Sequence, residues 1–120
     1  MDNKEFSRQL EGRTKRFAIS IIKLSVKLPG SPEGRVIRTQ LTKAGTSVGA
    51  NYREANRARS KADFNNKISI CESEASESVY WLEITEEMEW IPSDKISPVL
   101  KEANELLALF TSIGNSNKSQ

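Results

Sequence analysis

The sequence predicts an all-α protein, an antiparallel up-down-up-down four-helix bundle that forms a single domain over residues 1–120. Apolar residues recur at helical spacing through long stretches that contain no proline, and the four prolines fall into two clusters between such stretches. The connections left between the expected helices are short, which favours antiparallel neighbours. A chain of 120 residues can also bury a core without disulfides or metals.

The first helix is expected over about residues 6–28, because one apolar stripe runs along it at spacings of seven, four, three and four. The stripe consists of Leu10, Phe17, Ile21, Leu24 and Leu28. A second stripe on the same helix consists of Ile19, Ile22 and Val26. Together they make an apolar arc wider than one neighbouring helix requires. The arc therefore predicts self-association.

The second helix is expected over about residues 32–58, with Ser31 as N-cap and Pro32 as its first residue. Its apolar stripe consists of Ile37, Leu41, Ala44, Val48, Tyr52 and Ala55. Gly45 and Gly49 fall inside this expected helix and, being four residues apart, share one face of it. They predict close packing of another helix, within the bundle or between subunits, and a kink is the alternative.

The third helix is expected over about residues 60–91, from a Ser60–Asp63 capping motif to Pro92. Its core stripe consists of Phe64, Ile68, Cys71, Ala75, Val79 and Leu82, and a further stripe of Tyr80, Trp81, Ile84 and Met88 lies near its end. The fourth helix is expected over about residues 97–113, followed by a polar tail at 114–120. Its apolar face consists of Val99, Leu100, Ala103, Leu106, Leu107 and Phe110.

The residues that usually carry catalysis are scarce. The chain has no histidine, which removes the commonest general base and the commonest transition-metal ligand. Cys71 lies on the core stripe of the third helix, which is typical of a buried, inert thiol. The run Gly30–Gly34 lacks the Lys-Ser/Thr of a phosphate-binding loop. We therefore expect no enzymatic activity, no metal and no cofactor.

The chain carries no apolar run of the roughly 20 residues that cross a bilayer, and its first ten residues lack the apolar segment of a signal peptide. With a single cysteine it has no internal disulfide, which fits a reducing compartment. These features predict a cytoplasmic protein without a membrane partner.

Charge is distributed unevenly along the chain. Residues 1–70 hold 15 basic and 6 acidic side chains, whereas residues 71–120 hold 3 basic and 10 acidic ones. On the second helix a basic stripe lies opposite the apolar one and extends for about 33 Å from Arg35 to Arg57. The candidate nucleic-acid-binding residues are Arg35, Arg38, Arg53, Arg57, Arg59 and Lys61.

Arginine suits phosphate because its planar guanidinium donates two parallel hydrogen bonds, so this stripe could follow a nucleic-acid backbone without reading its sequence. A surface helix also needs a polar face, and the same arginines fit an ordinary solvated surface or ion pairs with the acidic half of the chain. Phosphate binding further requires that the acidic third helix face away from the ligand.

Several segments resemble one known family. The run from Glu33 to Ala55 contains Gly45-Thr46-Ser47-Val48-Gly49-Ala50-Asn51, and it is followed by Arg59-Ser60-Lys61-Ala62-Asp63-Phe64 and by Tyr80-Trp81-Leu82-Glu83. This pattern resembles the bacterial four-helix-bundle family encoded in intervening sequences of 23S ribosomal RNA genes. The resemblance covers about residues 15–113.

The resemblance implies a four-helix bundle that assembles as a homopentameric ring and has no established enzymatic activity. It also implies similarity to the accessory proteins of diversity-generating retroelements, which are basic pentameric barrels that bind nucleic acid and a reverse transcriptase. We therefore expect a non-catalytic oligomer that binds RNA or DNA phosphates through the basic stripe. The alternative is a protein-interaction scaffold, a ring that recruits a partner such as a polymerase without binding nucleic acid itself.

Overall fold

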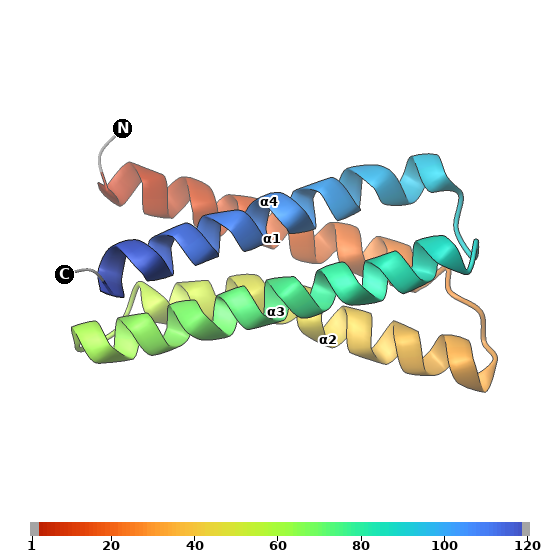
Figure 1. Ribbon diagram of the computed structural model, residues 1–120, viewed down its shortest axis with the longest axis horizontal. Coiled ribbons are helices and arrows are strands. Elements are labelled where there is room, and N and C mark those ends of the chain that lie inside the picture. The colour runs from red at the N-terminus through yellow and green to blue at the C-terminus, as the bar shows by residue number, and fades with distance from the viewer. Residues whose placement is uncertain (1–2, 119–120) are drawn as a thin grey trace.

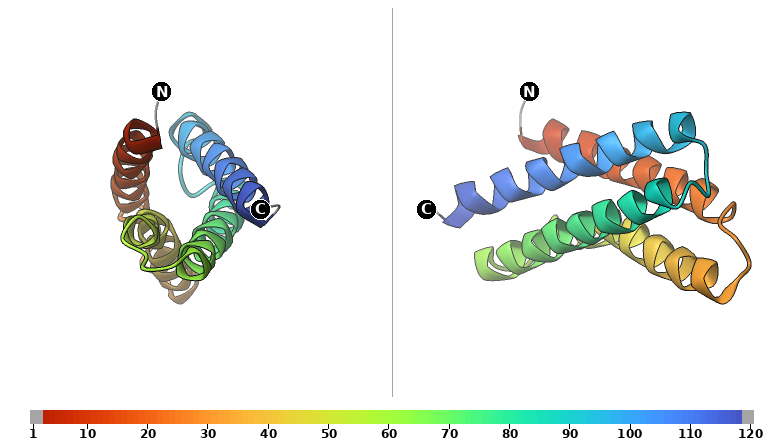
Figure 2. Two further views of the ribbon diagram at one scale, coloured as in Figure 1. Left: turned by 90° about the vertical axis from the view of Figure 1, so that its left-hand side faces the viewer. Right: turned by 45° about the vertical axis from the view of Figure 1, so that its right-hand side comes forward.

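The computed structural model describes residues 3–118 as four antiparallel helices joined by short connections (Figure 1). The helices are α1 Asn3–Ser25, α2 Pro32–Ala55, α3 Lys61–Glu87 and α4 Ser93–Lys118. Seen nearly end-on, they surround one central core (Figure 2). Within the described residues α1 packs against α2 and α4 but not against α3, so α1 and α3 lie diagonally across the bundle. The predicted all-α four-helix fold is confirmed.

The two predicted serine caps begin α2 and α3. The Ser31 hydroxyl accepts a hydrogen bond from the Gly34 backbone N–H at 3.1 Å, and Pro32 follows it in the first turn. The Ser60 hydroxyl accepts from the Asp63 backbone N–H at 3.0 Å. Each hydroxyl satisfies one of the backbone donors that a helix N-terminus leaves without a partner. Between these caps α2 runs without a break through both of its glycines.

The C-terminal ends of the first three helices differ from the predicted bounds. α1 ends at Ser25 and not at residue 28, because the chain tightens there into bonds from Lys27 N–H to Leu24 and from Leu28 N–H to Ser25. α2 ends at Ala55 rather than 58 through the same kind of turn. α3 ends at Glu87 rather than 91, because Glu89 adopts a positive φ of 56° that reverses the chain.

The fourth helix is longer at both ends than the predicted 97–113. It begins at Ser93 and contains Pro98, although Ser97-Pro98 had indicated its start. Ile91 and Ile96 are 3% and 0% exposed, so burial of these two side chains fixes the first turn ahead of the proline. The predicted polar tail is helical as far as Lys118, and its last two positions lie outside the described residues.

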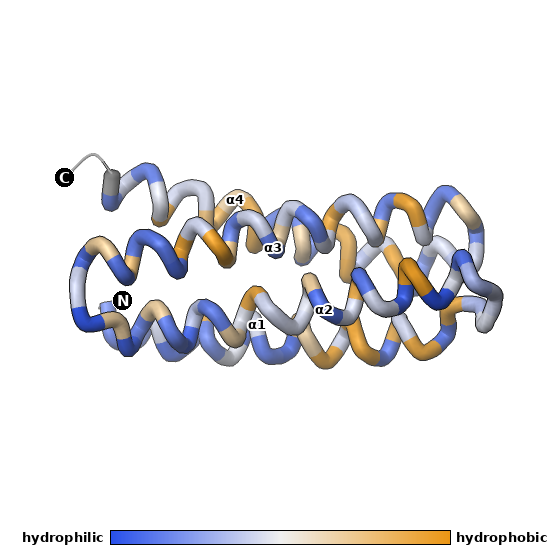
Figure 3. Tube along the Cα trace, turned by 90° about the horizontal axis from the view of Figure 1, so that it is seen from below, coloured by the Kyte–Doolittle hydropathy of each residue, from blue (hydrophilic) through white to orange (hydrophobic). Residues whose placement is uncertain are grey.

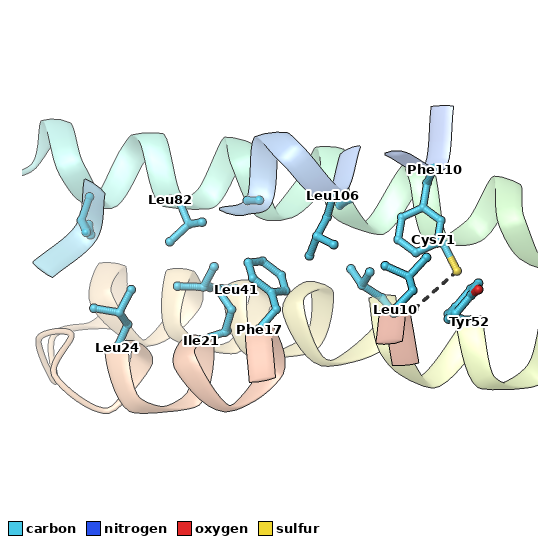
Figure 4. Packing of buried hydrophobic residues seen from close by; sticks show 14 of the residues in the cluster. Leu10, Phe17, Ile21, Leu24, Leu41, Tyr52, Cys71, Leu82, Leu106 and Phe110 are labelled. Atoms are coloured by element: carbon cyan, nitrogen blue, oxygen red, sulfur yellow. Dashed lines mark hydrogen bonds between the residues drawn. The ribbon is translucent and has the colours of Figure 1, made fainter. Parts of the chain in front are cut away.

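The predicted apolar stripes form the core. Figure 4 shows core side chains pointing into the space between the helices, among them Phe17 of α1, Leu41 of α2, Leu82 of α3 and Leu106 of α4. Buried hydroxyl groups are satisfied within their own helices: Thr14, for example, donates to the Leu10 carbonyl at 2.9 Å. Along the described part of the chain no helix has both the length and the apolar character that crossing a membrane requires.

An ion-pair network joins α1 to α4, the pair of adjacent helices with the least mutual contact. The Arg13 guanidinium donates two hydrogen bonds of 2.7 Å to the two carboxylate oxygens of Glu102 and a third, of 2.9 Å, to Glu105. The hydrogen bond with Glu102 raises the pKa of Arg13, so the guanidinium stays charged. The two-pronged geometry fixes the position of α4 relative to α1.

Gly45 and Gly49 lie at the contact between α1 and α2, inside the bundle. A Cβ atom at Gly45 would lie 2.6 Å from Cγ1 of Ile21. A Cβ atom at Gly49 would lie 2.9 Å from Oγ1 of Thr14 and 3.3 Å from its backbone carbon. Both glycines are buried, so they let α1 approach the α2 backbone more closely than any other residue would allow.

We predict that Gly49→Ala destabilises the protein by about 1–2 kcal/mol, since the added methyl group must push α1 away and this outweighs its better helix propensity. Gly12→Ala is the matched control, because a Cβ there meets only the flexible end of Arg16 at 3.2 Å. The control is expected to stabilise the helix by up to about 1 kcal/mol. Urea denaturation of both variants measures the difference, and equal stability of the two would contradict the close packing.

Candidate nucleic-acid interface

A shallow groove of about 470 Å³ runs between the outer faces of α1 and α2. Its central part is formed by small residues, because Gly49 brings the two helices together there and Ala18, Thr46 and Ala50 flank the contact. Cationic side chains stand beside it, namely Lys15 of α1 together with Arg53 and Arg57, and the acidic residues that line it are Glu11 and Glu54. The groove therefore combines room for a ligand with exposed positive charge.

Two of the predicted arginines belong to this groove. Arg53 is 57% exposed, and its Nε lies 3.8 Å from a carboxylate oxygen of Glu11, a loose ion pair in water. The other oxygen of Glu11 accepts a hydrogen bond of 2.8 Å from the Asn56 side chain, which holds the carboxylate in place. Arg57 is exposed and, within residues 3–118, takes part in no ion pair.

The turn after α2 continues the positive charge. Arg59 is exposed in the connection from α2 to α3, and Lys61 is exposed as the first residue of α3. Lys4 and Arg8 of α1 line a second shallow hollow together with Asn56 at the end of α2. The basic end of the bundle is the set of exposed cations on α1, at the end of α2, in the following turn and at the first residue of α3: Lys4, Arg8, Lys15, Arg53, Arg57, Arg59 and Lys61.

The contribution of α1 was missed in the sequence analysis, which placed the whole basic surface on the second helix. Lys4, Arg8 and Lys15 follow one another at spacings of four and seven, so they share one outer face of α1. That spacing was readable, but the tight α1–α2 contact that brings this face beside Arg53 depends on the folded structure.

Arg35 lies apart from the basic end. It is exposed near the start of α2, about 27 Å along the helix from Arg53. Between the two, the same face carries Thr39, Thr42 and Thr46, and Gly49 on that face is buried. The stripe predicted as continuous is therefore a group of cations at one end and a separate arginine at the other.

Arg38 serves the fold. Its guanidinium donates a hydrogen bond of 2.5 Å to the backbone carbonyl of Leu28, and the side chain is half-buried. Leu28 belongs to the turn that ends α1, where carbonyl groups have no helical partner and the helix dipole favours a positive charge. Arg38 thus ties α2 to the end of α1 and is not available to a ligand in this arrangement.

A group of three acidic residues lies at the end of the bundle opposite the basic end. Glu83, Glu86 and Glu87 lie in the last turns of α3, at the end of the bundle where α1 also finishes (Figure 1). The basic end lies where α1 begins and α2 finishes. A phosphate bound at the basic end is therefore far from these three carboxylates.

Cys71 is the one cysteine of the chain, and its thiol lies in the core. Burial raises the pKa of the Cys71 thiol to about 12, and the thiol donates to the Val48 carbonyl at 3.4 Å, the dashed line in Figure 4. At neutral pH Cys71 is thus a protonated core residue. Across residues 3–118 no three acidic, histidine or cysteine side chains come together in a group that could hold a metal ion.

The comparisons with known proteins agree on one relationship. Residues 9–112 match the family model described as 23S rRNA-intervening sequence protein. The chain is also similar to the crystal structure of a protein of unknown function from the S23 ribosomal protein family of Bacteroides thetaiotaomicron. The two share 36% sequence identity over 87% of this chain and 96% of that one, with a TM-score of 0.80. No curated protein matches the chain.

The position of Arg38 leads to a stability prediction. Arg38→Ala leaves the Leu28 carbonyl without its charged donor, and we expect it to lower the free energy of unfolding by about 1–3 kcal/mol. Arg35→Ala is the matched control on the same helix, since Arg35 is exposed, and it should change stability by less than about 0.5 kcal/mol. Thermal unfolding of both variants tests this, and an unchanged Tm for Arg38→Ala would assign that arginine to the free surface.

Proposed function

The chain belongs to the family of 23S rRNA-intervening sequence proteins, and from this premise we propose that it is a non-catalytic homo-oligomer that binds RNA or DNA phosphates through its basic end. The observation that supports this most is the convergence of cations from α1, α2 and the α2–α3 turn on one end of the bundle.

The chemistry of this surface suits a phosphate backbone. Arg53 and Arg57 can each offer paired N–H donors to phosphate oxygens, and Lys15 adds a mobile ammonium group across the groove. The small residues between them leave space for a ribose or deoxyribose ring to approach the α1–α2 contact. The residues that line the groove include no aromatic side chain on which a base could stack. Binding in this form positions a nucleic acid without reading its bases.

The homo-oligomeric part of the proposal is supported by exposed apolar side chains. Ile19 and Ile22 of α1 are 42% and 44% exposed in the single chain, and Val26, directly after α1, is 67% exposed. Such a cluster on one outer face is typical of a surface that a partner covers. The resemblance of the sequence to ring-forming relatives favours a pentamer.

The first experiment is a titration of the purified protein against a structured RNA and a duplex DNA at about 50 mM and 200 mM salt. If phosphate contacts provide the affinity, binding weakens steeply between the two salt concentrations and varies little with sequence. A protein partner held with little salt dependence, in the absence of any nucleic-acid binding at low salt, would favour the scaffold alternative.

The arginines are tested by Arg53→Glu together with Arg57→Glu. We expect affinity for RNA and DNA to fall at least tenfold for all sequences alike, and the dependence of log K on log salt to become shallower by about two phosphate contacts. Lys95→Glu with Lys101→Glu makes the same charge change on exposed positions of α4 and is expected to bind far better than the arginine variant.

Circular dichroism and light scattering accompany both variants. Unfolding or loss of assembly in the arginine variant would mean that Arg53 and Arg57 are structural. Equal loss of affinity in the two variants would instead reduce the effect to net charge and contradict a defined site.

A further inference from the structure

Two outer faces of the bundle expose apolar side chains that the single chain leaves uncovered. The first, called here the α1 face, is formed by Ile19 and Ile22 of α1 and by Val26 in the turn that directly follows, and the three recur at helical spacing. Figure 3 shows hydrophobic residues crowding the half of α1 that leads into the α1–α2 connection, whereas its N-terminal half is mostly hydrophilic. This half of α1 is therefore apolar toward the core and toward solvent.

The second, called here the α3 face, lies on the outer side of α3. Tyr80 and Met88 are 56% and 52% exposed, and Ile84 lies half-buried between them at spacings of four. The Tyr80 ring packs edge-on against Trp81 with centroids 4.9 Å apart, and the Trp81 indole N–H donates to Glu77 at 3.2 Å. These contacts fix an aromatic ring that projects from the surface, a feature that is enriched at the centres of interfaces.

The two faces occupy corresponding heights on opposite sides of the molecule. α1 and α3 are diagonal in the bundle, so their outer sides point away from each other. Both faces belong to the C-terminal halves of their helices, which finish at the same end of the bundle (Figure 1). Figure 4 places Leu82 of α3 level with the turn between Ile21 and Leu24 of α1, so Ile22 and Ile84 lie at similar heights.

The charges around the two faces are complementary. Lys23 and Lys27 lie beside Ile22 and Val26 of the α1 face, and both are exposed. Glu83 and Glu87 are exposed beside the α3 face, with Glu77 also close to Tyr80. Two copies that joined α1 face to α1 face would bring lysines together, and two α3 faces would bring carboxylates together. Opposite faces instead pair positive with negative charge around an apolar centre.

We propose that the α1 face of one molecule docks on the α3 face of a second copy of the same chain. This inference rests on the homo-oligomer of the proposed function and specifies which surfaces build it. Such a contact is head-to-tail, because each molecule uses two different surfaces. Since the two faces lie at matching heights, successive molecules stand side by side with parallel axes. The outer side of α2, which carries Arg53 and Arg57, stays outside the contact.

Cysteine cross-linking tests the pairing. In a Cys71→Ser background, where serine can still donate to the Val48 carbonyl, the variant with both Ile22→Cys and Ile84→Cys is treated with a short bismaleimide. We expect a ladder of covalent multimers on a denaturing gel. Each single variant should remain monomeric on the gel, because neither face meets itself. Ile22→Cys paired with Ala108→Cys, an exposed position on α4, is the control and should give no ladder.

Other outcomes overturn the proposal in distinguishable ways. Dimers from Ile22→Cys alone would establish a symmetric α1–α1 contact instead. An assembled protein by light scattering, without cross-linking in the double variant, would keep the homo-oligomer and reject these two faces. A monomeric mass for the unmodified protein at all concentrations would reject the oligomer itself, while nucleic-acid titration of that monomer would still test the basic end separately.

Discussion

The arrangement of this bundle depends on how closely α1 approaches α2. Gly45 and Gly49 carry no side chain at the two points of α2 where Ile21 and Thr14 of α1 approach. Thr14 can be fully buried there because its hydroxyl donates within α1, to the carbonyls of Leu10 and Glu11. At this contact, Thr14 forms its hydrogen bonds within α1 and packs against the backbone of α2 at Gly49. A wider separation would open this contact and remove the floor of the groove beside Arg53.

On its other side, α1 is joined to α4 by ion pairs and not by close backbone packing. Where α1 meets α4 the helices share fewer contacts, and Arg13 joins them through Glu102 and Glu105. These side chains are about one-third to one-half exposed, so the network adds orientation more than stability. The bundle is therefore asymmetric: one helix pair is fixed by steric fit, and another by a charged, two-pronged contact. The candidate interface is built on the sterically fixed pair, which gives Lys15 and Arg53 a rigid support.

Periodicity was enough to predict the helices and the core, because burial selects apolar residues every three or four positions regardless of partner. It did not predict the helix ends, since Ile91 and Ile96 start α4 early by entering the core, against the local preference of Ser97-Pro98. The sequence also predicted that six cations form one nucleic-acid-binding site. The structure separates them, because Arg38 bonds to Leu28 and Arg35 lies a helix length away, and it adds lysines from α1 that only tertiary packing brings near. Exposed charge alone does not reveal which cations meet.

The faces of the molecule divide the possible roles among the helices. α1 and α3 expose apolar clusters, the C-terminal part of α2 exposes cations, and Glu83, Glu86 and Glu87 of α3 lie at the end opposite the basic one. If copies join through the α1 and α3 faces with parallel axes, every basic end lies at the same rim of the assembly, and the acidic ends lie at the other. One molecule can make only a few phosphate contacts, whereas the basic ends of all subunits together can make several times as many. Because linked sites act together, weak contacts at each subunit combine into strong binding. Assembly would thereby turn a chain with a net charge of only +2 into an effective ligand for a polyanion.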